Sequence, residues 1–357
     1  MRQQHRLFPS RPAALAVVAV TLAANLGLAA AGSPSQSAPR WEVFDPGVTE
    51  SLRGLSAVSA DVAWATGSNG RWLRTIDGGR TWQSGQILGA ETLGVRDIEA
   101  FDGLYAVALT IGSPGRIYRT NDGGYSWDLV YEDDRPDVFF NCMDFADRDR
   151  GYAVGDPIDG RFLFIETTDG GKNWAPLSAP HRPEPEPGEA QFAASGTCLQ
   201  ATGNDVWIGT GGSVARVFHS DNRGRRWNAA ATPLQQGSAA KGVFGLLMDP
   251  DGHGIAVGGD YSLEDDPTDA VALSHDGGAS WSAEGITGLT GFRSALASLE
   301  GGTDVLVAVG PAGTDISYDA GRSWSAIAGP GFHVTRAADD GAVWAAGADG
   351  RVARLAR

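Results

Sequence analysis

Basic residues are scarce in this 357-residue chain, which has 28 Lys and Arg against 43 Asp and Glu and a formal net charge of −15. A surface with so large an excess of negative charge repels nucleic acid and anionic membranes, so we expect neither as a partner. Neutral or cationic partners are compatible with this charge.

The motifs of the common enzyme and metal-binding classes are missing as well. The chain has no P-loop, no dinucleotide-binding glycine pattern and no nucleophile elbow. Its His and Cys residues have no zinc-binding spacing, and the acidic run Glu264–Asp266 with Asp269 lacks the spacing of an EF-hand loop. We therefore predict no cofactor and no metal.

Long helical patterns are also absent, and a repeat takes their place. The phrase Ser/Thr-x-Asp-x-Gly-x-x-Trp occurs at 75–82, 120–127, 167–174, 274–281 and 317–324, with a degenerate copy at 220–227. Its third positions, Asp77, Asp122, Asp169, Asn222, Asp276 and Asp319, lie 45, 47, 53, 54 and 43 residues apart. Short β segments with a period of about 40–50 residues predict a β-propeller.

Each copy of this phrase, which we call a box, has the composition of a tight turn between two strands. The hydroxyl and carboxylate can bond the backbone of their own turn, and the glycine permits positive φ. The Trp begins the next strand and can pack on a neighbouring sheet. We therefore predict structural roles for the six box residues at the third position, and no role in catalysis.

An apolar stretch and a Gly-containing turn recur seven times upstream of the boxes, so each unit contains an inner, a second, a third and an outer strand. The seventh unit stops at Arg357 before any outer strand. The segment 41–45 begins with Trp41, as every outer strand begins with Trp. The sequence thus predicts an all-β fold: a seven-bladed propeller over 41–357, with four-stranded antiparallel blades, whose last blade is completed by 41–45.

The first 40 residues do not follow the repeat. Three arginines precede an apolar, Ala-rich run that ends at Ala29-Ala30-Ala31, which is typical of a secretory signal peptide at 1–31; an uncleaved membrane anchor is the alternative. A Ser/Pro-containing linker, predicted to be disordered, follows at 32–40. Cleavage would leave 25 basic and 43 acidic residues, a net charge of −18. We expect a periplasmic or secreted monomer that is not inserted in a membrane.

The only two cysteines, Cys142 and Cys198, fall on the inner strands of consecutive blades. An oxidising compartment would allow them to form a disulfide. Neighbouring inner strands can also lie too far apart for one, so two buried free thiols are equally compatible with the sequence.

Irregular segments interrupt the repeat in blades 3 to 5, and such segments commonly carry function. They are the links 175–197 and 228–241 and the turns 155–161, 209–216 and 258–268, all expected on the face opposite the boxes. As candidate catalytic residues they offer Glu189, Asp156, Asp260 and Tyr261, and as candidate binding residues Arg161, Arg216 and Lys241. Glu189 and Asp156 could form a carboxylate pair, and Tyr261 beside Asp260 could act as nucleophile and base. Turn capping and solvation of the rim are the simpler roles for each.

The boxes resemble those of the Asp-box (BNR) repeat propellers. The unit at 51–82, SLRGLSAVSADVAWATGSNGRWLRTIDGGRTW, resembles the photosystem II stability/assembly factor group and its bacterial relatives with WD40/YVTN/BNR-like repeats. That resemblance covers about 41–357 and implies a seven-bladed scaffold that escorts membrane-protein assembly. Blades 3 to 5 are also similar to bacterial relatives described as glycosyl hydrolase-like or oxidoreductase-like.

Two functions follow as hypotheses. The first is an extracytoplasmic scaffold that binds or assembles another protein. The second is a carbohydrate-active enzyme of the sialidase type, with a glycan as ligand and its site on the face opposite the boxes. The sequence leaves open whether the chain is an enzyme.

Overall fold

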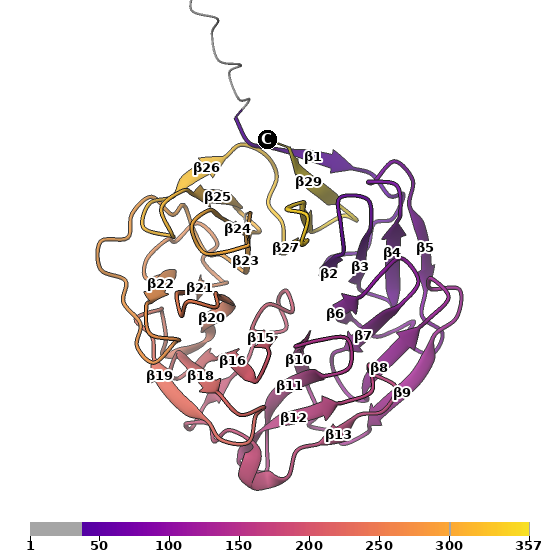
Figure 1. Ribbon diagram of the computed structural model, residues 1–357, viewed down its shortest axis with the longest axis horizontal. Coiled ribbons are helices and arrows are strands. Elements are labelled where there is room, and N and C mark those ends of the chain that lie inside the picture. Colours follow the sequence, from indigo (N-terminus) through magenta and orange to yellow (C-terminus); the bar gives the residue numbers. More distant parts are fainter. Residues whose placement is uncertain (1–37, 300, 357) are drawn as a thin grey trace, which may run out of the picture. The chain divides into compact units, whose positions relative to one another are not determined.

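The computed structural model describes residues 38–299 and 301–356. The predicted signal peptide and most of the predicted linker lie outside these residues. Within the described range, seven antiparallel sheets are arranged in a ring (Figure 1). The predicted all-β, seven-bladed propeller is therefore confirmed.

Blades 1 to 3 each contain four strands in chain order from the channel outward. Blade 1 consists of β2 (Leu52–Ala57), β3 (Ala63–Gly67), β4 (Arg71–Thr75) and β5 (Gln83–Gln86). Blade 2 consists of β6 (Val95–Ala100), β7 (Ala106–Thr110), β8 (Gly115–Thr120) and β9 (Asp128–Asp133). Blade 3 consists of β10 (Phe140–Phe145), β11 (Gly151–Ile158), β12 (Arg161–Thr167) and β13 (Ala175–Pro176).

The remaining blades follow the same plan, with one variation in blade 5. Blade 4 consists of β15 (Leu199–Thr202), β16 (Asp205–Gly209), β18 (Arg216–Ser220) and β19 (Asn228–Ala231). Blade 5 consists of β20 (Ser238–Met248), β21 (Gly254–Asp260) and β22 (Val271–Ser274), and a single bridge from Leu273 to Ser282 stands in for its outer strand. Blade 6 consists of β23 (Ala295–Ser298), β24 (Leu306–Gly310), β25 (Gly313–Ser317) and β26 (Ser325–Ile327). Blade 7 consists of β27 (Val334–Ala337), β28 (Val343–Ala346), β29 (Val352–Ala356) and β1 (Arg40–Phe44).

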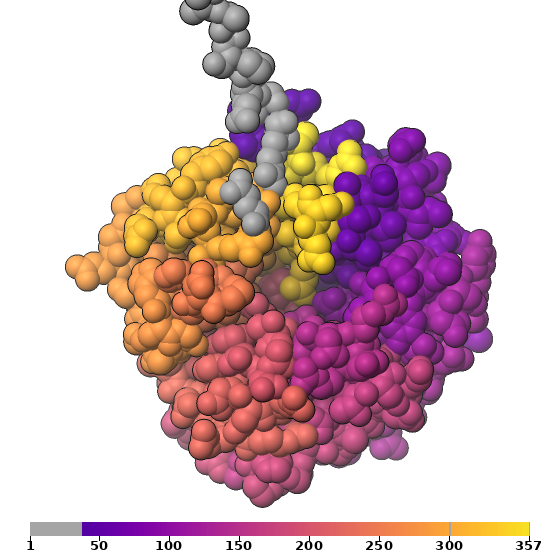
Figure 2. Space-filling model, in the orientation of Figure 1, coloured from indigo at the N-terminus to yellow at the C-terminus, as the bar shows by residue number. Residues whose placement is uncertain are grey.

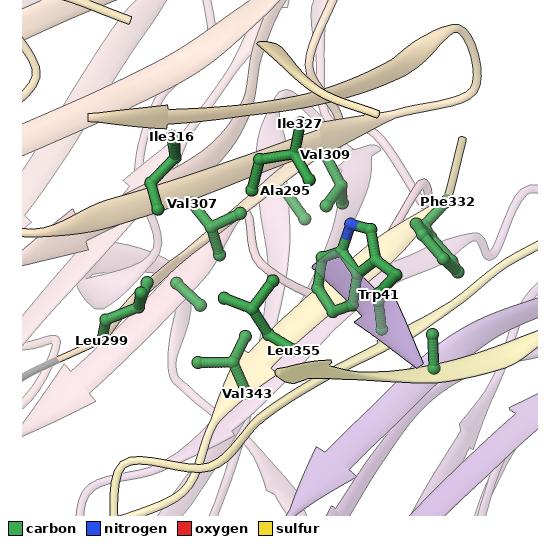
Figure 3. Packing of buried hydrophobic residues seen from close by; sticks show 13 residues of the cluster. Trp41, Ala295, Leu299, Val307, Val309, Ile316, Ile327, Phe332, Val343 and Leu355 are labelled. Carbon is green, nitrogen blue, oxygen red and sulfur yellow. The ribbon is translucent and has the colours of Figure 1, made fainter. Parts of the chain in front are cut away.

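The two ends of the described chain meet in blade 7, as predicted. Strand β1 pairs antiparallel with β29 from Arg40 opposite Ala356 to Phe44 opposite Val352. Trp41 inserts into the apolar cluster between blades 6 and 7, against Phe332 and Leu355 (Figure 3). Its indole N–H donates to Thr314 Oγ1 at 3.1 Å, so its one polar group is satisfied.

The boxes are closed by hydrogen bonds within the turn. In the first box, Thr75 Oγ1 donates to Asp77 Oδ1 at 3.0 Å and accepts from the N–H of Gly79 at 2.9 Å. The Asp77 oxygens accept from the N–H and the hydroxyl of Thr81, at 2.9 and 2.6 Å. These bonds from Thr81 hold the pKa of Asp77 below its ordinary value. The equivalent bonds recur at Asp122, Asp169, Asp276 and Asp319, and the Asn222 carbonyl oxygen accepts in the same way.

Apolar residues fill the space between each pair of neighbouring blades, which gives seven clusters around the ring. Strands supply them because alternate side chains point to opposite faces of a sheet, and both faces of every blade are covered. Full burial of one such residue, Leu52 for example, stabilises the fold by about 1.5–3 kcal/mol. An eighth cluster, Phe192, Phe244 and Phe292 with Ala194 packed against it, belongs to no pair of blades and is described with the site below.

Cys142 on β10 and Cys198, just before β15, form a disulfide bond, with their Cα atoms 6.0 Å apart. The inner strands of blades 3 and 4 are therefore close enough to be joined, and the alternative of two free thiols does not apply. Both residues are fully buried in the cluster between these blades.

Candidate functional site

A chamber of about 440 Å³ opens on the face of the ring opposite the boxes. Its walls come from the starts of inner strands (Arg53, Arg96, Asn141) and from turns between second and third strands (Ile111, Tyr261, Pro311). Both kinds of position lie on that face, because each inner strand runs from it toward the box face. The volume is that of an ordinary small-ligand or side-chain pocket.

The floor of the chamber is built by the link between blades 3 and 4, which crosses the channel. Ala193 O accepts a hydrogen bond from Arg96 of blade 2, and Ala194 O accepts one from Arg53 of blade 1, both at 3.3 Å. Ser195 Oγ donates to Ser294 O, at the start of blade 6, at 2.7 Å. Gly196 O accepts from Arg336 of blade 7 at 3.1 Å. Residues 191–197 therefore contact blades on all sides of the channel, and we call them the plug.

The plug is held at both ends. Cys198 joins its end to Cys142 through the disulfide, and the N–H of Gln191 at its start donates to Asp156 Oδ1 at 3.1 Å. Gly196 has φ +71°, and a Cβ at this position would lie 2.2 Å from an oxygen of Asp97. Only glycine fits this close approach to the inner strand of blade 2.

Two arginines give the chamber a positive wall. Apart from the 3.3 Å bonds to the plug, the side chains of Arg53 and Arg96 form no hydrogen bond or ion pair within the described part of the chain, although the carboxylate of Glu264, which also lines the chamber, attracts Arg53 electrostatically. Burial, and after it the neighbouring Arg96, lowers the pKa of Arg53 to about 10, and burial also lowers the pKa of Arg96. Both remain charged at neutral pH. Two adjacent guanidinium groups outnumber the carboxylate of Glu264 beside them and form an anion-binding surface, here within a strongly acidic chain.

Aromatic rings form the opposite side. Phe192 of the plug stacks on Phe244 of β20 with ring centroids 3.8 Å apart, and Phe292 meets Phe244 edge-on at 4.7 Å. Tyr261, which is half exposed, stands at the rim with its ring edge-on to Phe192 and Phe244. The chamber thus joins a cationic wall to an apolar one.

The irregular segments of blades 3 to 5 are joined to one another beside this chamber. Strand β14 (Glu189–Ala190) pairs with β17 (Gly211–Gly212), which pairs with the first part of β20. In the pairing of β20 with β21, Lys241 lies opposite Asp260. The segments that interrupt the repeat therefore assemble into one extension of blade 5, adjacent to the plug.

Several residues predicted as site residues instead form hydrogen bonds and ion pairs that hold these segments together. Glu189 is buried, and its two oxygens accept from Arg216 at 3.0 and 2.5 Å, from the Thr210 hydroxyl and from the N–H of Glu186. Arg161 bonds to Arg182 O and to the carboxylate of Glu184, within the same link. Glu189, Arg216 and Arg161 thus have partners within the fold.

The other predicted residues lie at or near the chamber. Asp260 accepts from the N–H and the hydroxyl of Ser262, at 2.9 and 2.6 Å, and so caps its own turn, while Lys241 Nζ lies 3.9 Å from it. Asp156 Oδ1 accepts from Asn141 Nδ2 at 2.9 Å and from the N–H of Gln191 at 3.1 Å, and burial raises the pKa of Asp156. Tyr261 lines the chamber itself.

The contacts of these carboxylates bear on the enzyme hypothesis. Glycoside hydrolysis needs two carboxyl groups about 5–5.5 Å apart, or about 6.5–9.5 Å apart with a water between them. No hydrogen bond joins Glu189 to Asp156 among the described residues, and each carboxylate holds separate backbone and side-chain groups. The expected carboxylate pair is therefore not formed by direct contact, and the catalytic roles of Glu189, Asp156, Asp260 and Tyr261 stay predictions. Within 38–299 and 301–356, no group of three or more His, Cys, Asp or Glu is placed to hold a metal ion.

A larger cavity of about 1110 Å³ lies at the other end of the channel, on the box face. Figure 2 shows one face of the ring with the hollow at its centre. Its lining comes from the ends of inner strands and the turns that follow them, including Asp144 and Arg336. Arg336 Nη2 already lies 3.5 Å from Glu99 and 3.9 Å from Asp97. Because its arginine is already neutralised, this cavity offers less to a ligand than the smaller chamber does.

The sequence predicted the face of the ring on which the chamber opens and two of the segments that line it, 175–197 and 258–268. It did not predict the lining residues that lie on inner strands. Arg53, Arg96, Phe244 and Phe292 were not among the candidates. One feature of the sequence pointed to these arginines. In three inner segments an arginine directly follows the first apolar residue: Arg53, Arg96 and Arg293. The third of these, Arg293, turns away to a buried ion pair with Asp315, so the pattern alone does not separate site from structure.

Comparison with known proteins gives the fold and no family. No protein-family model matches the chain, and no curated protein matches it. Among solved structures it is similar to YCF48 bound to D1 peptide, with a TM-score of 0.63 and 17% identity over 89% of this chain and 97% of that one. YCF48 from Cyanidioschyzon merolae gives a TM-score of 0.62 and 13% identity over 88% of this chain and 98% of the other. A GH74 xyloglucanase from Xanthomonas campestris gives 0.54 and 13%, over 80% of this chain and 56% of that chain.

Proposed function

We propose that this protein is an extracytoplasmic scaffold that binds another protein through the chamber opposite the boxes. The observation that carries the proposal is the pair of arginines, Arg53 and Arg96, which form no ion pair among the described residues and lie beside an aromatic wall. A carboxylate of the partner would neutralise the arginines, and an apolar side chain would cover the aromatic wall. Burying charged and apolar groups together in one pocket is typical of the anchor points of protein interfaces.

Three further observations support this function. YCF48, whose fold is similar, is described as bound to a peptide of D1. The chamber is built on rigid inner strands and a plug anchored by a disulfide, which favours binding by a preformed site. The carboxylates of Glu189 and Asp260 are bonded to groups of the surrounding segments.

An extracytoplasmic location belongs to the same proposal. The signal-like sequence at 1–31 supports it, and so does the disulfide, because structural disulfides persist in oxidising compartments. Amino-terminal sequencing of the protein released by osmotic shock tests the location: a mature chain that begins near residue 32 is expected. Recovery of the uncleaved chain in the cytoplasmic fraction would contradict it.

Crosslinking in living cells tests the binding function. The full chain, tagged at its carboxyl end, is compared with a variant carrying Arg53→Gln and Arg96→Gln. We expect the double variant to lose a specific set of crosslinked proteins. A control with Arg80→Gln and Arg226→Gln, both in box turns, should keep that set. Equal recovery by all three proteins, or recovery of none, would argue against the proposal.

A further inference from the structure

Three buried polar atoms at one wall of the chamber have no partner. Asn141 is fully buried and Gln191 is 5% exposed. Asn141 Oδ1, Gln191 Oε1 and Gln191 Nε2 all lack a hydrogen bond among the described residues, and both residues line the chamber. Each of the three atoms has less than 1 Å² exposed, so a ligand reaches them only when these side chains turn toward the chamber. Leaving a buried donor or acceptor unsatisfied costs about 1–3 kcal/mol, so native proteins rarely keep three of them together.

The orientation of these groups is set by the residue behind them. Asp156 Oδ1 accepts from Asn141 Nδ2 at 2.9 Å and from the main-chain N–H of Gln191 at 3.1 Å. Asn141 therefore directs its amide nitrogen to Asp156 and is left with its carbonyl oxygen as a free acceptor. Gln191 supplies both a free donor and a free acceptor. The wall is matched to a group that also has one donor and one acceptor.

We propose that Gln191 and Asn141 bind a peptide unit of the ligand, and so determine which chemical class enters the chamber. The inference rests on the proposed function and deepens it. The ligand's amide N–H would donate to Asn141 Oδ1 or Gln191 Oε1, and its carbonyl would accept from Gln191 Nε2. The carboxylate held by Arg53 and Arg96 and the apolar side chain held by the aromatic wall then belong to residues near that peptide unit.

An N-acetylated sugar also carries an amide, and the half-exposed ring of Tyr261 at the rim offers it a face, but the three phenylalanines inside the chamber favour a peptide. Sugars stack on exposed ring faces, whereas Phe192 and Phe244 stack on each other and Phe292 covers Phe244 edge-on. The three phenylalanines are at most 9% exposed. Their free edges are better matched to an aliphatic or aromatic side chain than to a pyranose ring.

Small probes can separate the amide from the carboxylate. N-acetyl-L-phenylalanine carries a carboxylate, an amide and an apolar ring, and 3-phenylpropionate carries the same groups without the amide. Binding of each to the mature protein is measured by isothermal titration calorimetry, together with N-acetylglucosamine and with N-acetyl-L-aspartate N-methylamide, whose carboxylate is a side chain. We expect N-acetyl-L-phenylalanine to bind at least about tenfold tighter than 3-phenylpropionate, because two hydrogen bonds to otherwise unsatisfied groups are gained. Comparison with the aspartate probe shows whether a chain-end or a side-chain carboxylate is preferred.

Variants give the decisive comparison. Gln191→Met keeps the length of the side chain and removes its amide, so the two phenyl probes should then bind within about twofold of each other. The variant should unfold at the same temperature as the wild type or higher, because an unsatisfied polar group has been removed. Gln86→Met, on the outer strand β5, is the matched control and should keep the tenfold preference.

The outcomes distinguish this inference from the function it rests on. Equal binding of the two phenyl probes to the wild type would overturn the inference, while weakening of both by Arg53→Gln would leave the anion site standing. Tight, Gln191-dependent binding of N-acetylglucosamine would overturn the peptide in favour of an acetamido sugar. Failure of every carboxylate probe to bind would contradict both proposals.

Discussion

Three carboxylates share one arginine in the channel, and this predicts an unusual dependence of stability on pH. Asp97 on β6 is fully buried and lies 3.9 Å from Arg336 Nη2, with Glu99 3.5 Å from the same atom and Asp144 nearby. Burial raises the pKa of Asp97 to about 7 and that of Asp144 to about 6, and it raises the pKa of Glu99 well above its ordinary value. A single guanidinium offsets only part of the cost of ionising one buried and two partly buried acids.

The sign of the effect follows from proton binding. In the unfolded chain Asp97 ionises near pH 3.8, whereas in the folded protein it keeps its proton up to about pH 7. The folded state therefore binds more protons between these values, and the free energy of unfolding falls as the pH rises through this range. A shift from 3.8 to about 7 corresponds to about 4 kcal/mol. Asp97→Asn cannot ionise, so the stability of the variant relative to the wild type should rise by up to about 4 kcal/mol between pH 4 and pH 8.

Urea denaturation of both proteins at pH 4, 5, 6, 7 and 8 measures this difference. Subtracting one curve from the other removes the contribution of His333, whose pKa is lowered to about 4 by burial and which therefore gives the opposite slope below its ordinary pKa. Asp128→Asn, an exposed position on β9, serves as the control and should show no such trend. A difference between Asp97→Asn and wild type that stays constant over the whole range would refute the reasoning.

Four other predictions concern stability. Arg293→Met leaves Asp315 buried without its partner and should cost about 3–5 kcal/mol in urea denaturation, whereas Arg71→Met, at a partly exposed pair with Glu50, should cost about 1 kcal/mol or less; equal losses would contradict this. Replacing Cys142 and Cys198 by Ser should cost about 4 kcal/mol, since the bridge closes a loop with a sequence separation of 56, and an unchanged denaturation midpoint would count against it. Asp276→Ala removes the acceptors of its box and should cost about 1–3 kcal/mol, with Asp251→Ala as an exposed control. Deleting residues 38–44 should lower the unfolding temperature and promote aggregation measured by light scattering, because the edge of β29 and the pocket of Trp41 become exposed; an intact monomer of equal stability would show that closure is dispensable.

The fold was predictable because its information is local and repeated. A turn of the same composition returns every 43 to 54 residues, and each copy closes through hydrogen bonds of its own, with one backbone bond to an earlier turn of the same blade. Even the long-range pairing of β1 with β29 was predictable from one local feature, because β1 begins with Trp41 as an outer strand does. The face that carries the candidate site was predictable for a related reason: departures from a strict repeat stand out against it.

The composition of the candidate site was less predictable. Arg53 and Arg96 lie on inner strands that resemble the other inner strands in sequence, and a similar arginine, Arg293, serves a buried ion pair instead. Glu189 and Arg216 were both plausible site residues, yet in the structure they bond to each other. Polar residues in irregular segments have the same composition whether they meet a ligand or a neighbouring loop, so a sequence cannot separate the two cases.

By itself, the sequence determined the number of blades, the order of strands within each and the closure of the ring, because period, turn chemistry and alternation act over a few residues at a time. Only the tertiary structure decided that residues 191–197 cross the channel and meet arginines about 95 to 140 residues earlier in the chain. Those contacts arise because seven separate sheets are arranged around one axis, which brings strands far apart in the sequence close together. The charge and the unsatisfied amides of the chamber come from residues of several blades that meet at this axis, so no single segment of the chain contains them.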